Sequence, residues 1–296
     1  MDVIQLCMVW NRKKRLELVQ ENAAAGDVAE IFAQVRDELG MPFVSTYYQS
    51  LAFCPQFLRM HWDAMRPVVR SNDFQKRSDR LRAEAYTAIH NYFSVSNLSS
   101  AVEESVAKEL PQAVEYFYER DAMLLLITAL QSTAFEGAPI SEPEAHAPQP
   151  QRSQPEVAPL LIPNDGLAHG IRNVFEDMRR HLDVAVASSD YSALGRWPKF
   201  VFDWWRNLKP NVASPLYPEQ RRRIGDSAMQ HAAELPSLSL LSVQALEEQG
   251  LSKEQIGSIV HINEAFFDAF SNTVLNFAFA HIALEGGNGR GAERAA

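Results

Sequence analysis

Cysteine is nearly absent from this chain of 296 residues. Cys7 and Cys54 are the only two, and no Cys-x-x-Cys spacing occurs. A disulfide framework, a zinc ribbon and a thioredoxin-like redox pair therefore have no support in the sequence. A reducing cytoplasm is the location that we expect.

Features of nucleic-acid binding, membrane insertion and metal binding are also scarce. The net charge is −9, and no basic stripe is interleaved with aromatic residues, so we expect no nucleic-acid partner. The long apolar stretch at residues 266–284 contains Asp268 and His281, which favours a buried helix over a membrane span. The eight histidines show no His-Glu-x-x-His spacing, and we expect neither a metal nor a cofactor.

Sustained alternation of apolar and polar residues, the pattern of a half-buried strand, is missing as well. Apolar residues recur instead at helical spacing, as in Val28, Ile31, Phe32 and Val35. We therefore predict an all-α fold. In its first half the helices are expected at residues 27–39, 73–92, 98–108 and 111–133.

Proline is sparse in the helical segments but crowds into residues 137–163. Such a composition is typical of an extended linker. We predict a first helical repeat at residues 1–136, a Pro-rich linker at 137–165 and a second helical repeat at 166–286. A disordered, Gly- and Arg-rich tail is expected at 287–296.

The two helical halves match without a gap when the sequence is shifted by 143 positions. The identical pairs include Phe32 and Phe175, Arg36 and Arg179, Tyr48 and Tyr191, Pro55 and Pro198, Trp62 and Trp205, and Pro67 and Pro210. A long period with two copies predicts a duplicated domain that packs as a pseudo-twofold dimer within one chain.

One position at which the copies differ is Asp190, which corresponds to Tyr47 in the first copy. Ser188, Ser189 or Asp190 can each cap the helix that follows, and a cap is the simplest explanation of the carboxylate. Tyrosine, however, is a poor substitute for a capping aspartate. The difference suggests that the second copy carries the chemistry.

Several segments resemble a known family. They are residues 40–44 (GMPFV), 124–130 (LLLITAL), 159–161 (PLL), 189–191 (SDY), 197–199 (WPK) and 235–236 (LP). In these segments the sequence resembles the group I α-haloacid dehalogenases, also called D,L-2-haloacid dehalogenases. The resemblance extends over residues 26–286 and implies an all-α pseudo-dimer with the active site between its halves.

The resemblance also implies a reaction and a set of site residues. In the family an aspartate activates a water that attacks the halogen-bearing carbon, with no covalent enzyme intermediate. Asp190 matches that catalytic aspartate and Ser189 its neighbour. Further substrate-binding residues are expected at family site positions where this sequence differs: Arg120 in place of a water-orienting Asn, Phe43 in place of a Trp, Thr46 in place of an aromatic residue, and Asn263 near a Tyr. Tyr47, beside them, is expected to join the site.

Three functions stay open at this point. The first is a hydrolytic dehalogenase of short 2-halocarboxylic acids. The second is a relative of the same fold that binds or hydrolyses another small carboxylate, and the third is a non-catalytic helical ligand-binding protein. The expected partner is a small carboxylate, without nucleic acid or membrane, and a homodimer is left open. Arg120 is either the anchor for the substrate carboxylate or one member of a surface charge cluster with Glu119 and Asp121.

Overall fold

The computed structural model describes four ranges of the chain: 18–99, 108–137, 169–184 and 189–288. Several predicted features lie outside these residues. They are most of the 98–108 helix, nearly all of the 137–165 linker with residues 159–161, Ser188, and all but the first two residues of the 287–296 tail.

Helices make up the secondary structure of the described residues, and these residues contain no strand, which confirms the all-α prediction. The α-helices are α2 (Gly26–Leu39), α3 (Thr46–Leu51), α4 (Pro55–Val69), α5 (Asn72–Tyr92), α6 (Glu109–Phe135), α7 (His169–Leu182), α8 (Ser189–Leu194), α9 (Pro198–Val212), α10 (Leu216–Ala233), α11 (Val243–Glu248) and α12 (Lys253–Glu285). Two short 3₁₀ helices are η1 (Glu21–Ala23) and η4 (Ser239–Leu241).

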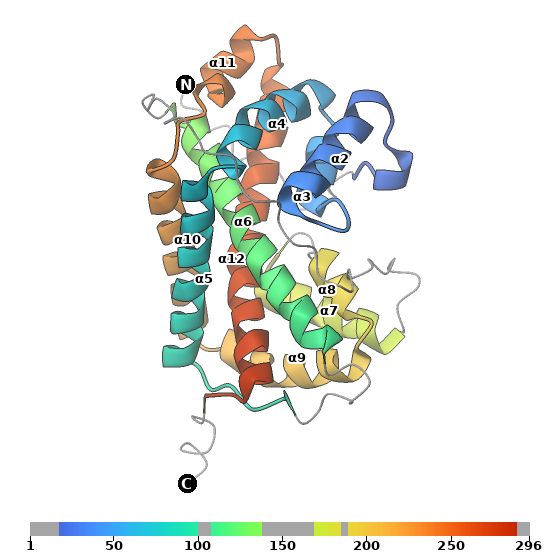
Figure 1. The fold of residues 1–296 in the computed structure, drawn as a ribbon, viewed down its shortest axis with the longest axis vertical. Helices are drawn as coiled ribbons and strands as arrows, with labels where there is room; N and C mark the ends of the chain where they lie inside the picture. The colour runs from blue at the N-terminus through green and yellow to red at the C-terminus, as the bar shows by residue number, and fades with distance from the viewer. Residues whose placement is uncertain (1–17, 100–107, 138–168, 185–188, 289–296) are drawn as a thin grey trace.

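The long helices α6 and α12 form the centre of the molecule and pack against each other (Figure 1). Every residue from Leu124 to Leu130 on α6 is at most 1% exposed, so the helix is buried around its whole circumference. A helix that is apolar on all sides requires such a central position. Neither α6 nor α12, nor any other described helix, is long and apolar enough to cross a membrane.

The start of α12 is set by a capping box. Ser252 Oγ accepts a hydrogen bond from the Gln255 backbone N at 3.2 Å, and Gln255 Oε1 accepts one from the Ser252 backbone N at 2.9 Å. The two bonds satisfy donors that a helix start leaves without intrahelical partners. From this point the helix continues without interruption through the core to Glu285.

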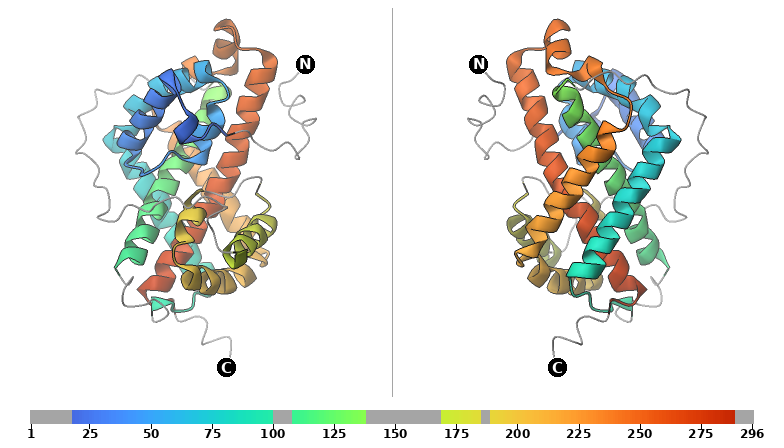
Figure 2. Two further views of the ribbon diagram at one scale, coloured as in Figure 1. Left: turned by 90° about the vertical axis from the view of Figure 1, so that its right-hand side faces the viewer. Right: turned by 90° about the vertical axis from the view of Figure 1, so that its left-hand side faces the viewer.

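The shorter helices form two groups on one side of the central pair. Figure 2 shows α2–α4 and α7–α9 at opposite ends of that side, with α5 and α10 on the other side. Helix α7 begins and ends 143 residues after α2, and the same spacing separates α8 from α3 and α9 from α4. Each of α4 and α9 also begins at a proline and contains a second one, Pro67 or Pro210, in its last turn.

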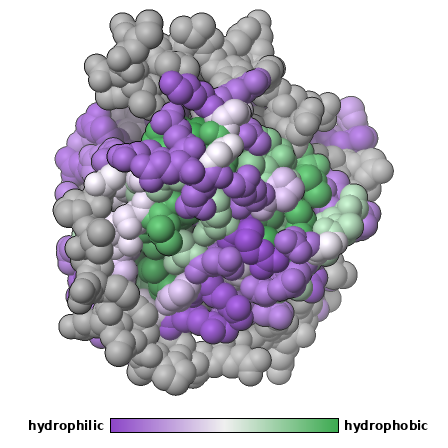
Figure 3. All heavy atoms as spheres, turned by 90° about the horizontal axis from the view of Figure 1, so that it is seen from above, coloured by the Kyte–Doolittle hydropathy of each residue, from purple (hydrophilic) through white to green (hydrophobic). Residues whose placement is uncertain are grey.

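The surface is mixed in polarity. Seen down the long axis, polar residues cover much of this end and leave apolar patches between them (Figure 3). Scattered exposed apolar side chains such as Leu240, which is 66% exposed, are ordinary on a globular protein.

Candidate active site

Helix α8 carries the predicted catalytic carboxylate into the protein interior. Asp190, in the first turn of α8, is 2% exposed and Ser189 is 5% exposed. Leu194 is buried on the same helix and anchors it to the core. An aspartate that only caps a helix can do so at the surface, where its charge costs nothing, so burial favours a chemical role for Asp190.

A second buried carboxyl, Asp121 of α6, lies beside Asp190. Asp121 is fully buried, and its side chain interacts directly with that of Asp190. Neither of its carboxyl oxygens meets a well-aligned hydrogen-bond donor in the described part of the chain. The two aspartates come from helices far apart in the sequence, and tertiary packing brings them together.

This pairing determines the protonation of Asp121. Burial raises the pKa of Asp121 well above its usual range, and the negative charge and hydrogen bond of Asp190 raise it further. The Thr273 side chain acts in the opposite direction. Two carboxylates this close in a low-dielectric site cannot both ionise readily, so the pairing favours the protonated form of Asp121.

A chain of buried hydrogen bonds adjoins the aspartate pair. Asn276 Nδ2 donates to Tyr191 Oη at 2.7 Å, and Tyr217 Oη donates to Asn276 Oδ1 at 2.7 Å. The pKa of Tyr191 is raised well above its usual range, mainly by burial and then by the neighbouring Tyr217, with smaller effects from the nearby carboxyl groups of Asp121 and Asp190. Tyr191 is therefore neutral and its ring is held in place next to the carboxyl pair.

Arg120 is buried rather than part of a surface cluster. Its side chain is 2% exposed, its Nη1 donates to Glu119 Oε1 at 2.5 Å, and its guanidinium carbon lies 5.0 Å from the centre of the Tyr116 ring. Its Nε has no hydrogen-bond partner among the described residues. A buried guanidinium with a bare N–H can accept a further anionic partner.

Tyr116 connects this arginine with the loop after α2. Its hydroxyl donates to the Gly40 carbonyl oxygen at 2.6 Å. Burial raises the pKa of Tyr116, the charge of Arg120 lowers it, and that of Asp190 raises it, so both charged groups lie near this ring. The same loop carries Phe43, whose ring packs 6.2 Å from that of Phe117. Phe43, Arg120 and Asp190 thus lie around Tyr116 and its neighbour Phe117 on α6.

The structure places Tyr47 and Asn263 in a hydrogen-bonded pair of their own. Tyr47 Oη donates to Asn263 Oδ1 at 2.9 Å, and Asn263 Nδ2 donates to the Thr128 carbonyl at 3.0 Å. The Tyr47 ring also lies 6.3 Å from that of Phe270. Thr46 accepts a hydrogen bond from Ser50 Oγ at its backbone carbonyl. The roles of these residues in substrate binding stay predictions.

Sequence reasoning missed Asp121, Tyr116 and Thr273. For Asp121 a signal was present in the helix spacing. Its neighbours three and four positions away on α6 include Phe117, Leu124 and Leu125, which places the carboxyl on an apolar face. The adjacent charges of Glu119 and Arg120 hide this pattern.

A surface hollow elsewhere on the molecule does not compete with this site. It has a volume of about 440 Å³ and lies between α10 and α12, with Arg222, Asp226 and Phe267 in its lining. Neither Asp121 nor Asp190 lines it. The buried, interacting carboxyls of Asp121 and Asp190 are therefore the better candidate for the active site than the surface hollow.

Comparison with known proteins gives a consistent set of relatives. The family described as "Halocarboxylic acid dehydrogenase DehI" matches residues 42–191, just over half of the chain. The chain is 23% identical over 268 residues to an (R)-2-haloacid dehalogenase of Pseudomonas putida, which covers 87% of this chain and 89% of that protein. An (R)-2-haloacid dehalogenase of Rhizobium sp. (strain NHG3) is 20% identical over 228 residues, or 75% of this chain and 89% of that protein.

Solved structures share the fold. A D-2-haloacid dehalogenase in complex with L-LA superposes with a TM-score of 0.83 at 19% identity, over 92% of this chain and 97% of that one. A mutant of a D-2-haloacid dehalogenase gives a TM-score of 0.82 at 20% identity over the same shares. At these identities the likeness establishes the arrangement of the helices.

Proposed function

Because this chain belongs to the halocarboxylic acid dehydrogenase DehI family, we propose that it is a hydrolase of carbon–halogen bonds that acts on short 2-halocarboxylic acids. The observation that carries the proposal is the burial of Asp190. It lies in the segment matched by the family, in a setting where a carboxylate is costly unless it has a function.

In the proposed reaction Asp190 is the general base. It takes a proton from a water molecule as the water oxygen attacks the halogen-bearing carbon from the side opposite the halogen. The C–O bond forms while the carbon–halogen bond breaks, and the halide leaves with the bonding electron pair. The product is a 2-hydroxy acid of inverted configuration, and no covalent enzyme intermediate forms. A positioned base of this kind contributes roughly 10²- to 10⁴-fold to the rate.

Arg120 is the proposed anchor for the substrate carboxylate. Its bare Nε and its burial support this role, since an arginine in a dry site binds a carboxylate more strongly than one in water. The Tyr116 ring beneath the guanidinium restricts its position, and the ion pair with Glu119 uses Nη1 and leaves Nε without a partner among the described residues. Phe43, in the loop that Tyr116 holds, is the proposed apolar wall.

The two helix groups are proposed to descend from one duplicated unit and to pack as a pseudo-dimer. The equal 143-residue spacing of three helix pairs supports this. Under this relation Tyr47 is the counterpart of Asp190. Tyr47 packs against the aromatic ring of Phe270 on α12, whereas Asp190 meets the carboxyl of Asp121 on α6. One copy would then stabilise the core while the other performs the reaction.

The test is halide release from racemic 2-chloropropionate and from bromoacetate. We expect wild-type protein to release halide and Asp190→Asn to lose roughly 10²- to 10⁴-fold of that rate. Asp226→Asn, which removes an exposed carboxylate of α10 in the lining of the surface hollow, is the matched control and should keep the activity. Absence of halide release by wild-type protein on both substrates would instead favour a relative that acts on another small carboxylate.

A further inference from the structure

Asp121 is a buried ionisable group that interacts with Asp190 and to which the proposed reaction gives no role. We propose that Asp121 is the second carboxyl of the reaction site, and that it keeps its proton and holds the attacking water against Asp190. This inference rests on the proposed dehalogenation and adds to it a residue that touches the reacting water.

Position and burial carry the inference first. Asp121 projects from the central helix α6 and Asp190 from the short helix α8, and the two side chains meet. Asp121 is 0% exposed, and both of its oxygens lack a well-aligned donor among residues of the described ranges. The hydroxyl of Ser189, next to Asp190, is also buried without a hydrogen-bond partner in that part of the chain. Buried polar atoms in this state require a polar partner, and water is the smallest.

The surroundings favour a neutral Asp121. From α8 it faces the carboxylate of Asp190 and the neutral phenol of Tyr191, and from α12 the hydroxyl of Thr273. None of these groups carries a positive charge that would stabilise a second carboxylate. Burial and the charge of Asp190 both raise the pKa of Asp121, which keeps the carboxyl protonated at neutral pH.

One protonated and one ionised carboxyl can orient a single water completely. An ionised carboxylate only accepts hydrogen bonds, whereas a carboxylic acid also donates one. When the water is bound, the Asp121 O–H donates to one lone pair of the water oxygen instead of to Asp190, and one water hydrogen points to Asp190. The second lone pair of the oxygen then faces the halogen-bearing carbon. During attack the proton moves from water to Asp190, and Asp121 keeps its own proton.

Two substitutions of Asp121 distinguish a role in holding the water from a purely structural role. Asp121→Asn keeps a neutral donor and acceptor of the same size but cannot ionise. Asp121→Leu keeps the bulk and removes the donor. If Asp121 only fills space, leucine serves as well as asparagine. If it holds the water, asparagine serves and leucine does not.

The experiment measures kcat and kcat/KM for halide release from 2-chloropropionate between about pH 5 and pH 10. We expect wild type to lose activity at the alkaline end, where Asp121 ionises. Asp121→Asn should retain activity within roughly tenfold and lose the alkaline decline, whereas Asp121→Leu should lose roughly 100-fold or more in kcat. Glu264→Gln removes a carboxyl of α12 whose pKa is also raised, chiefly by partial burial, but which does not interact with Asp190; it should leave the pH profile unchanged.

Infrared spectroscopy supplies a readout without turnover. At pH 7 wild type should show the band of a protonated carboxylic acid that Asp121→Asn lacks and Glu264→Gln retains. An unaltered pH profile in an active Asp121→Asn variant, full activity of Asp121→Leu, or absence of the infrared band would each overturn the role of Asp121 and leave the proposed dehalogenation intact. Failure of wild type to release halide would overturn both, and the two failures are thereby distinguished.

Discussion

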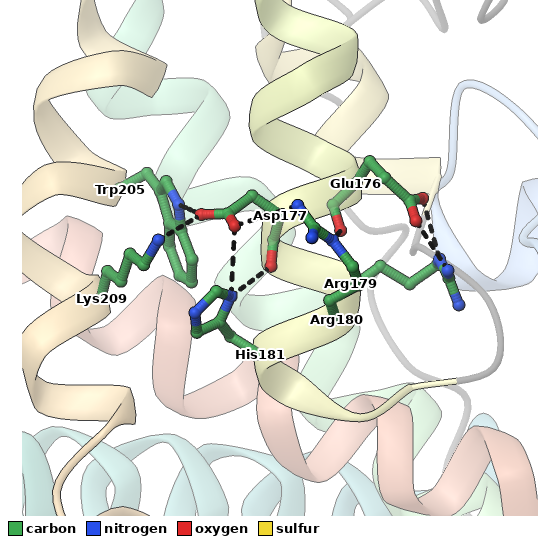
Figure 4. Close-up of polar contacts among 7 residues, drawn as sticks. All are labelled: Glu176, Asp177, Arg179, Arg180, His181, Trp205 and Lys209. Atoms are coloured by element: carbon green, nitrogen blue, oxygen red, sulfur yellow. Dashed lines mark hydrogen bonds and ion pairs between the residues drawn. The ribbon is translucent and has the colours of Figure 1, made fainter.

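Trp205 donates its indole N–H to Asp177 Oδ2 at 2.8 Å, across the contact between α9 and α7 (Figure 4). Lys209 Nζ lies 2.7 Å from the same oxygen. In the first helix group Trp62 donates to Gln34 Oε1 at 3.0 Å, and both pairs span 28 residues. In both helix groups a tryptophan thus bonds to the equivalent position on the neighbouring helix, and the acceptor is the carboxylate of Asp177 in one group and the amide of Gln34 in the other.

This relationship predicts that Asp177→Ala destabilises the protein. The substitution leaves the buried indole N–H of Trp205 without an acceptor and removes the ion pair with Lys209, at a cost of about 1–3 kcal/mol in the free energy of unfolding. Urea denaturation measures the effect. Gln34→Ala is the matched control, and because its bond to Trp62 carries no charge we expect a smaller loss; an equal or larger loss would contradict this account.

Arg120→Ala tests the carboxylate anchor. We expect KM for 2-chloropropionate to rise more than kcat falls, because a contact made equally in the ground state and the transition state affects binding alone. Steady-state halide release gives both constants. Arg82→Ala is the control, since Arg82 also stacks on an α6 tyrosine, at 5.2 Å from the Tyr118 ring, but lies outside the site. If kcat and KM were unchanged in Arg120→Ala, Arg120 would not bind the substrate and its role would be structural.

Asn276 connects two buried tyrosine hydroxyls, and its removal is expected to be costly. Asn276→Ala deprives Tyr191 and Tyr217 of their shared partner, which predicts a loss of about 2–5 kcal/mol from hydrogen bonding and packing together. Tyr217→Phe breaks one of these bonds only and should cost less. Thermal unfolding of the two variants provides the comparison, and the reverse order would rule out Asn276 as the centre of this network.

The contact between His281 of α12 and Glu115 predicts that the free energy of unfolding depends on pH near neutrality. The hydrogen bond to Glu115, at 3.1 Å, raises the pKa of His281, and the same bond is the main cause that lowers the pKa of Glu115. The stabilisation from His281 is complete below the pKa of an unfolded histidine, about 6.5, and is lost as pH rises through the higher folded value.

His281→Gln should remove this part of the pH dependence. We expect the variant and the wild type to differ by less than about 1 kcal/mol, because the pair is partly exposed, and to converge once the pH exceeds the raised pKa of His281. Urea denaturation at a series of pH values measures the difference. His90→Gln, at a nearby exposed histidine of α5, is the control. A difference that grows with rising pH would contradict the assigned sign.

The helices could be predicted from the sequence because their apolar residues recur at helical spacing over long segments. The ungapped match at a shift of 143 positions also indicated that Pro67 and Pro210 occupy matching positions, and they lie in the last turns of α4 and α9.

The pairing of Asp121 with Asp190 could not be read from the sequence. A charged triplet, Glu119 to Asp121, is typical of an exposed helix face, and its burial follows from the packing of α8 against the centre of the molecule. Tyr47 illustrates the opposite case. The repeat register relates it to Asp190, but related positions need not share a site, and the contacts of Tyr47 are with Asn263 and its aromatic neighbours.

Helix α8, which carries Asp190, has only six residues. A helix this short has no stability of its own in water and exists only while Tyr191 and Leu194 remain docked in the core. Asp121, by contrast, sits on the 27-residue helix α6. On heating, the reaction site would therefore come apart when α8 undocks, and inactivation would precede the loss of helical circular dichroism, which α6 and α12 dominate.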